Sequence, residues 1–94
     1  MKAKLLLRER YQIATSSFAE LRIWQVNQPV RGSKHEYKYA LVYVVEEKCV
    51  LRYDNEAGKG DHKHIDAEEV PYSFTTPAQL LADFWSDVDH WRQT

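Results

Sequence analysis

The chain has 94 residues, of which 44% are hydrophobic, and a formal net charge of −1 at pH 7. This length fits one domain spanning residues 1–94, and the near-zero charge argues against a polycation that binds nucleic acid in bulk. The charge is uneven, however: residues 1–38 carry eight Lys or Arg against three Asp or Glu, and residues 39–94 carry five against eleven. The two halves could serve different partners, unless they interleave in one sheet and their charges mix.

Neither the start of the chain nor its apolar runs indicate export or a membrane span. The apolar run 5–7 is too short for the core of a secretory signal, and the sequence has no stretch of about 18 apolar residues. The single Cys49 cannot form an internal disulfide, which fits a reducing compartment. We therefore expect a cytoplasmic protein in which Cys49 is a small core residue of a strand.

Alternating apolar and polar residues predict four strands. Residues 4–13 and 18–26 alternate on either side of a short polar turn, which is typical of an antiparallel hairpin. After a loop at 27–36, residues 38–45 are β-branched and aromatic, and their continuous apolar stretch favours a central strand covered on both faces. Residues 48–54 return as a fourth strand, which delivers the next segment to the end of a buried strand.

A helix is the clearest element of the C-terminal part. An acidic connector at 66–71 and a short extended segment at 72–74 lead to Thr76, a suitable N-cap. Pro77 suits the first helical position, and Gln79 completes a capping box. Apolar residues then repeat every three to four positions, as in an amphipathic helix. They are Leu80, Leu81, Phe84, Trp85, Val88 and Trp91.

These elements predict an α+β fold. An antiparallel sheet of four to five strands would carry the C-terminal helix on one face. The helix would pack through its apolar residues, and Asp83, Asp87 and Asp89 would lie mainly on the rest of its surface.

The titratable chemistry is concentrated at 52–64, which reads Arg-Tyr-Asp-Asn-Glu-Ala-Gly-Lys-Gly-Asp-His-Lys-His. Gly58 and Gly60, on either side of Lys59, allow positive φ and a close approach of the backbone to a ligand. His62 and His64 are two residues apart, so in extended chain both imidazoles leave the same face and the residue between them leaves the other. This segment is the candidate functional site.

Two imidazoles that face one space fit acid–base cleavage of a phosphodiester. One would accept the proton of a ribose 2′-hydroxyl and the other would protonate the leaving 5′-oxygen, which imidazole can do near neutral pH. Cationic neighbours would stabilise the phosphate charge, and an aspartate would orient a ring. The predicted catalytic residues are His62, His64, Lys59, Asp61 and Asp54, and the predicted substrate-binding residues are Arg52, Tyr53, Gly58, Gly60 and Lys63.

Several alternatives stay open at this point. His-x-His with Asp61 or Asp66 could bind a divalent metal, but no Cys-x-x-Cys or His-Glu-x-x-His motif is present, and we expect neither a metal nor another cofactor. The glycine-flanked lysine lacks P-loop spacing; it is an anion-binding nest or an ordinary turn. The histidines could also be plain polar residues of an exposed loop. Trp24, if exposed beside Arg22 and Arg8, would contribute to an RNA- or protein-binding face.

The same residues resemble the TumE-type toxins of bacterial and archaeal toxin–antitoxin operons. The resemblance covers nearly the whole chain and rests on residues 37–39, 52–55, 58–64 and 71–74. The run Lys-Gly-Asp-His-Lys-His is its most specific part. Lys63 agrees with the Arg or Lys usual between the two histidines, whereas Ile65 stands where a further His often follows. The resemblance implies a small cytoplasmic toxin encoded beside a helix-turn-helix antitoxin that binds and neutralises it.

We therefore expect the toxin of a type II toxin–antitoxin system that acts on RNA, as a metal-independent endoribonuclease using the histidine pair. The alternative is a non-catalytic protein- or nucleic-acid-interaction module that the antitoxin neutralises. The expected partners are the helix-turn-helix antitoxin and RNA, with no membrane, and a homodimer stays open.

Overall fold

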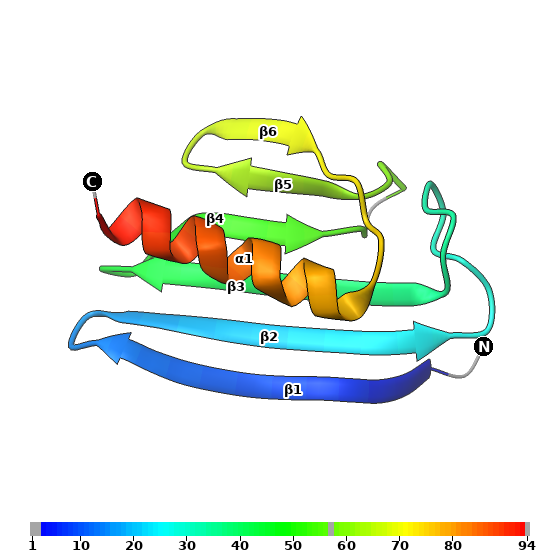
Figure 1. The fold of residues 1–94 in the computed structure, drawn as a ribbon, viewed down its shortest axis with the longest axis horizontal. Coiled ribbons are helices and arrows are strands. Elements are labelled where there is room, and N and C mark those ends of the chain that lie inside the picture. Colours follow the sequence, from blue (N-terminus) through cyan, green and yellow to red (C-terminus); the bar gives the residue numbers. More distant parts are fainter. Residues whose placement is uncertain (1–2, 57, 94) are drawn as a thin grey trace.

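The computed structural model describes residues 3–56 and 58–93, which form an antiparallel sheet and one helix (Figure 1). The strands are β1 (Ala3–Ala14), β2 (Ser17–Val26), β3 (Tyr37–Val45), β4 (Lys48–Asp54), β5 (His62–Ile65) and β6 (Glu68–Pro71), and the helix is α1 (Pro77–Arg92). Each strand pairs with the next one in the chain, in the order β1-β2-β3-β4-β5-β6. The α+β fold with a C-terminal helix on the sheet is confirmed, but the sheet has six strands instead of four to five.

The additional strands are β5 and β6, and β6 lies within the segment predicted to be an acidic connector. Each has four residues, and the pair turns at Asp66 and Ala67, with Asp66 at φ 54°. Their sequences, His-Lys-His-Ile and Glu-Glu-Val-Pro, contain few apolar residues, so they lack the apolar alternation that marks a strand. In the register of this hairpin His64 lies opposite Glu69 and Lys63 opposite Val70.

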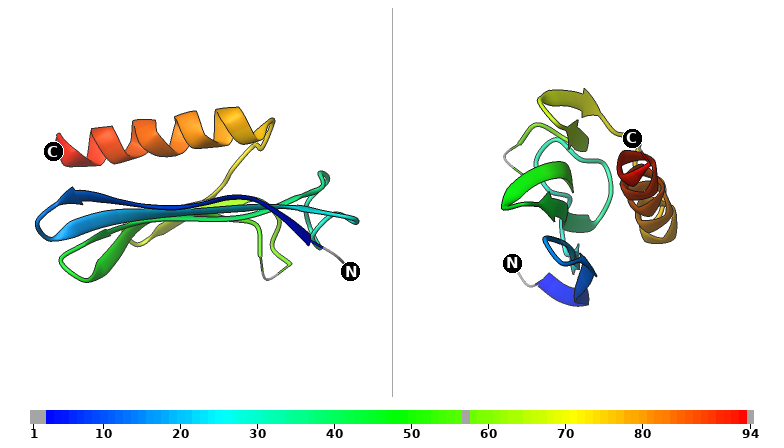
Figure 2. Two further views of the ribbon diagram at one scale, coloured as in Figure 1. Left: turned by 90° about the horizontal axis from the view of Figure 1, so that it is seen from below. Right: turned by 90° about the vertical axis from the view of Figure 1, so that its left-hand side faces the viewer.

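Helix α1 lies across one face of the sheet, and no element covers the opposite face within the described part of the chain (Figure 2). Leu80, Phe84 and Val88 of the helix are fully buried against the sheet. Burying a side chain of this size stabilises the fold by about 1.5–3 kcal/mol. The sheet residues of this core are Ala19, Leu21, Ile23, Tyr39, Leu41, Tyr43, Leu51 and Tyr53.

Strand β3 is central, but it is not covered on both faces as predicted. Val42 and Val44 on the open face are only half-buried. Val42 lies between Glu20 of β2 and Arg52 of β4, so long polar side chains flank it where a second layer was expected. Cys49 is exposed instead of buried, because it follows a register shift beside the β3–β4 turn at the end of the sheet.

The helix begins as predicted, with one difference. The Thr76 hydroxyl accepts a hydrogen bond from the Gln79 amide N–H (3.1 Å). The Gln79 side chain, however, donates to Asp83 Oδ1 (2.7 Å), so the capping box is only half formed. Asp83 and Asp87 also do not lie on the solvent side, because both accept hydrogen bonds from tyrosines of the sheet side, Tyr72 and Tyr53.

The charge asymmetry of the sequence persists in space. Because the sheet order follows the chain order, the two halves do not interleave. The basic half forms the β1–β2 edge, and the acidic half forms the β5–β6 edge and α1 (Figure 1). Among the described residues, no helix has the length and apolar character needed to cross a membrane.

Candidate functional site

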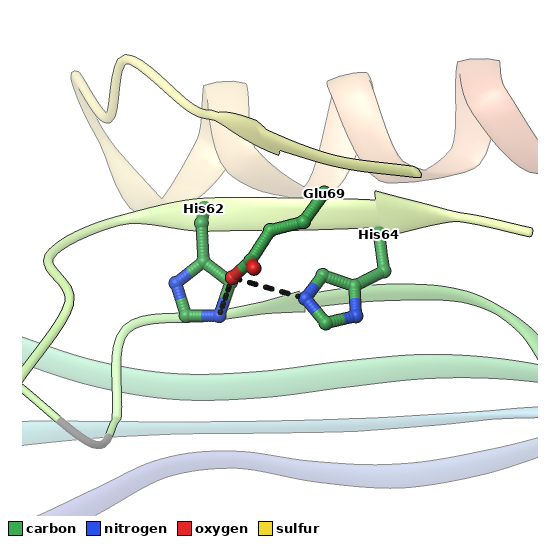
Figure 3. Close-up of side chains that lie close together, drawn as sticks. All are labelled: His62, His64 and Glu69. Carbon is green, nitrogen blue, oxygen red and sulfur yellow. Dashed lines mark ion pairs between the residues drawn. The ribbon is translucent and has the colours of Figure 1, made fainter. Parts of the chain in front are cut away.

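His62 and His64 project from β5 on the open face of the sheet, while Lys63 between them points to the helix side. The two imidazole centroids are 5.4 Å apart. The Lys63 Nζ instead lies 3.0 Å from Asp87 Oδ2 of α1. Glu69 reaches from β6 across β5 toward both imidazoles (Figure 3). The hairpin register therefore gathers three titratable side chains on one face.

Glu69 is the common neighbour of Lys59 and the two imidazoles at this site. Its Oε2 lies 3.2 Å from His64 Nε2 and 3.5 Å from His62 Nε2. Lys59 Nζ is also 3.5 Å from the same oxygen. His64 above all, followed by Lys59 and then His62, holds the pKa of the Glu69 carboxyl below its ordinary value. Glu69 is thus an ionised carboxylate that lies beside Lys59 and both imidazoles.

His62 is buried and held at both ring nitrogens. Its Nδ1 lies 2.9 Å from the carbonyl oxygen of Gly60, and its Nε2 lies 2.9 Å from Asp54 Oδ1. A carbonyl only accepts, so Nδ1 is the donor in the bond to Gly60, whereas the contact with Asp54 is an ion-pair distance. Arg52 Nε donates to the other Asp54 oxygen at 2.5 Å. Asp54 therefore joins Arg52 to His62.

His64 is held less firmly than His62. Its side chain is 39% exposed. Its Nε2 is enclosed but makes no hydrogen bond to the described residues, because Glu69, although near, lies off the hydrogen-bond direction. The His62 ring thus has a partner at each nitrogen, whereas His64 Nε2 makes no hydrogen bond to the described residues.

Asp61 serves a neighbouring cluster and not the histidine pair. Its carboxylate accepts hydrogen bonds from Ser33 Oγ (2.6 Å) and the Tyr39 hydroxyl (2.6 Å), and it lies 2.7 Å from His35 Nε2. Burial would raise the pKa of Asp61, but the bonds from these three residues outweigh it and leave the pKa lowered. His35 in turn stacks on Phe74, with ring centroids 3.8 Å apart.

Gly58 and Gly60 both adopt positive φ, 73° and 80°, as the sequence predicts. Of the two, only Gly60 lies so close to other backbone that a side chain would not fit. A Cβ there would lie 2.8 Å from the carbonyl oxygen of Gly32. The loops 27–36 and 55–61 therefore meet backbone to backbone. This contact fixes the Gly60 carbonyl that receives His62 Nδ1.

The remaining predicted residues divide between the two faces. Lys59, Asp61 and His62 line an open pocket of about 310 Å³ together with residues 69–71. Tyr53 is buried on the helix side, where its hydroxyl bonds to Asp87, and Lys63 lies 5.5 Å from its ring centroid. Burial first, and the bond to Asp87 second, raise the pKa of Tyr53. Of the predicted set, Tyr53 and Lys63 thus lie on the face away from the histidine pair.

The same face offers a set of metal ligands. His62, His64 and Glu69 each present a ligand atom, and these atoms lie within 4.8 Å of one another. Imidazole nitrogens with a carboxylate oxygen suit a divalent transition metal. The third ligand considered from the sequence was Asp61 or Asp66, but Asp61 is taken by its own cluster and Asp66 accepts from Trp91 Nε1 (3.3 Å).

Glu69 and His35 are the residues that the sequence analysis missed. A hairpin with a two-residue turn at 66–67 would have placed Glu69 opposite His64. No comparable signal marks His35, because its partners lie 26 and 39 residues away along the chain, at Asp61 and Phe74.

A comparison with protein-family models finds a match over residues 2–92 to a family described as Toxin TumE. The match covers all the strands of the sheet, the histidine pair and the whole helix. No curated protein and no solved structure matches the chain.

Proposed function

Since the chain belongs to the TumE toxin family, we propose that it is a type II toxin that cleaves RNA as a metal-independent endoribonuclease. The family makes it the toxin component of a toxin–antitoxin system and implies an antitoxin partner. The observation that carries the nuclease proposal is the pair of imidazoles on one open face, with centroids 5.4 Å apart and unequal partners.

In this proposal the two histidines have different roles. His64, with the unbonded Nε2, takes the proton of a ribose 2′-hydroxyl as the 2′-oxygen forms a bond to phosphorus. His62, held by the Gly60 carbonyl at Nδ1 and lying beside Asp54 at Nε2, gives a proton to the 5′-oxygen as the bond from phosphorus to that oxygen breaks. Glu69 stabilises the proton that His64 has gained. Lys59 and Arg52, both exposed beside the pair, neutralise the phosphate.

The test uses purified protein and labelled single-stranded RNA in excess chelator. The wild type is compared with His62→Ala and His64→Ala, and with His90→Ala as a matched histidine control on the exposed side of α1. Because acid–base catalysis contributes about 10²–10⁴-fold, we expect each pair variant to cleave at least 100-fold more slowly and the control to match the wild type. The fragments should end in 2′,3′-cyclic phosphate. Equal fragmentation by all four proteins refutes the proposal.

A metal centre at His62, His64 and Glu69 is a second candidate, because their ligand atoms lie within 4.8 Å of one another. It predicts that cleavage disappears in chelator and returns with added zinc or manganese. The metal-independent proposal predicts the same rate in chelator and in its absence.

The alternative of a non-catalytic module that the antitoxin neutralises has one structural observation in its favour. Strand β1 is a long sheet edge with exposed Leu5, Leu6 and Tyr11, and such an edge can pair with another chain. That chain would be a helix-turn-helix antitoxin or, in a homodimer, a second copy. Inhibition of the target in proportion to the amount of protein, without turnover, would favour this function over cleavage.

A further inference from the structure

The open face of the sheet carries a group of cations and aromatic rings that the nuclease proposal does not use. Along each strand, residues on the open face alternate with residues that face α1. In β2 the residues that face α1 are buried and those between them are half-buried or exposed. We call it the basic face; its residues are Arg8, Arg10, Phe18, Arg22, Trp24 and Lys38. The face occupies β1, β2 and the start of β3, on the side of the sheet away from the helix (Figure 2).

The cations of the basic face are not neutralised by the fold. Among the described residues, none of its Arg or Lys side chains forms an ion pair. Arg8 lies directly opposite Arg22 in the β1–β2 register. Like charges in opposite positions destabilise a sheet. This pair therefore costs folding stability, which indicates a role in binding an anion.

The aromatic rings are positioned beside these cations. Arg10 Cζ lies 3.9 Å from the Phe18 ring centroid. Arg22 and Lys38 both approach the Trp24 ring, at 5.8 and 5.5 Å from its centroid. A half-buried ring flanked by cations is suited to stack a nucleobase while the cations reach the adjacent phosphates.

The basic face leads directly to the histidine pair. In register across the sheet, Arg8 is followed by Arg22, Ala40, Asp54 and His62, one on each strand from β1 to β5. With strands about 4.8 Å apart, this row is roughly 19 Å long. A strand of nucleotides lying along it would run from the β1 edge to the open pocket. Bases must be unpaired to stack on protein rings, so the chemistry favours a single strand.

We propose that single-stranded RNA binds across the basic face, which guides it into the histidine site. The proposal deepens the proposed function and rests on it for the fate of the bound RNA, but binding itself requires no cleavage. Charge complementarity favours RNA over a protein occupant, because the only carboxylate among the open-face positions of β1 and β2 is Glu20, opposite Arg10.

The experiment measures binding separately from cleavage. The probe is a labelled single-stranded oligonucleotide with 2′-O-methyl riboses, which lacks the attacking hydroxyl, and binding is followed by fluorescence anisotropy over a salt series. Arg8→Glu/Arg22→Glu is compared with Lys48→Glu/Arg92→Glu, which changes the net charge equally at the β3–β4 turn and in α1. We expect the first variant to bind at least 10-fold more weakly and the second to stay within about twofold of the wild type. The salt slope should fall by about 1.4 for two lost phosphate contacts.

A further variant separates binding from folding. Arg8→Gln/Arg22→Gln removes the repulsion between opposite arginines, so its thermal midpoint should not fall while its RNA affinity does. Equal RNA binding by the wild type and both basic-face variants overturns the proposal, even if cleavage by His62 and His64 is intact. If the basic-face variants still bind RNA but are no longer inhibited by a co-expressed antitoxin, the basic face is a protein interface. That result also overturns the proposal. Normal binding by His62→Ala supports the proposal whether or not the wild type cleaves RNA.

Discussion

Replacing Asp61 with Ala tests whether its cluster holds the two loops of the candidate site in place. The carboxylate joins Ser33 and His35, from the loop between β2 and β3, to Tyr39 of β3. It also comes directly after Gly60, whose carbonyl anchors His62. Loss of the carboxylate should therefore destabilise the fold and loosen the anchor of the buried histidine.

The size of the effect follows from what is left without a partner. Hydrogen bonds to a charged group contribute about 1.5–3 kcal/mol each, but three that share one carboxylate do not add. Ser33 and His35 are half-buried and can bond to water, whereas Tyr39 is 0% exposed. An unsatisfied buried hydroxyl costs about 1–3 kcal/mol. We therefore expect Asp61→Ala to lower the free energy of unfolding by about 3 kcal/mol, and Asp61→Asn, which keeps an acceptor, by about 1 kcal/mol.

Urea denaturation of a double-mutant cycle measures this directly. With a slope of about 1–3 kcal/mol/M, the midpoint of Asp61→Ala should fall by about 1–3 M. In the Tyr39→Phe background the hydroxyl is absent, so the same substitution should cost only about 1 kcal/mol. The reasoning fails if Asp61→Ala costs less than about 1 kcal/mol, or if its cost is the same with and without the tyrosine hydroxyl.

Two further predictions concern pH and backbone conformation. The pKa values of Asp61 and Glu69 are both lowered in the folded state. The stabilisation by these ionised carboxylates is therefore present above their unfolded pKa of about 4 and is lost as pH falls through the folded pKa. Urea midpoints should drop from pH 5 to pH 3, and the drop should be smaller in Asp61→Asn. Gly60→Ala should lower the thermal midpoint more than Gly58→Ala. Both glycines have positive φ, which costs an alanine about 1–2 kcal/mol. A Cβ at Gly60 would also lie 2.8 Å from backbone, whereas a Cβ at Gly58 would meet the Arg31 side chain at 3.4 Å. Equal losses for the two glycine variants would contradict the close approach of the loops.

The elements that the sequence predicts well are those whose apolar residues repeat with a clear period. Strand β2 alternates Ala19, Leu21 and Ile23 with polar or aromatic residues, and the structure buries those three against the helix. Helix α1 combines a capping threonine with apolar residues every three to four positions, of which Leu80 and Phe84 are fully buried. Periodicity reports which face meets the core, so it is reliable wherever there is a core to meet.

Short charged strands escape that reasoning. The residues of β6 are largely exposed, so nothing in their hydrophobicity distinguishes a strand from an acidic loop. The omission hid Glu69, the carboxylate that lies beside both histidines. Likewise Cys49 looked like a core residue, because a pattern of alternation cannot reveal the register shift between Tyr43 and Val44.

The sequence predicts the position of some candidate site residues but not the contacts of others. The spacing of His62 and His64 is enough to put them on one face of an extended strand, since alternation is a local property. The partners of Asp61 could not be foreseen in this way. They lie 22 to 28 residues away, and the contact depends on how the loop between β2 and β3 folds back. That loop has no periodic pattern to read.

The alternation that puts the histidine pair on one face also separates chemistry from stability. Lys63 bonds to Asp87 on the helix side, whereas its neighbours His62 and His64 look the other way. A change at Lys63 should therefore affect the attachment of the helix and leave the imidazoles in place. Among the described residues, the groups around the pair come from residues 52–71, in β4, β5, β6 and the loop before β5. The helix thus packs on the face of the sheet opposite to the histidine pair.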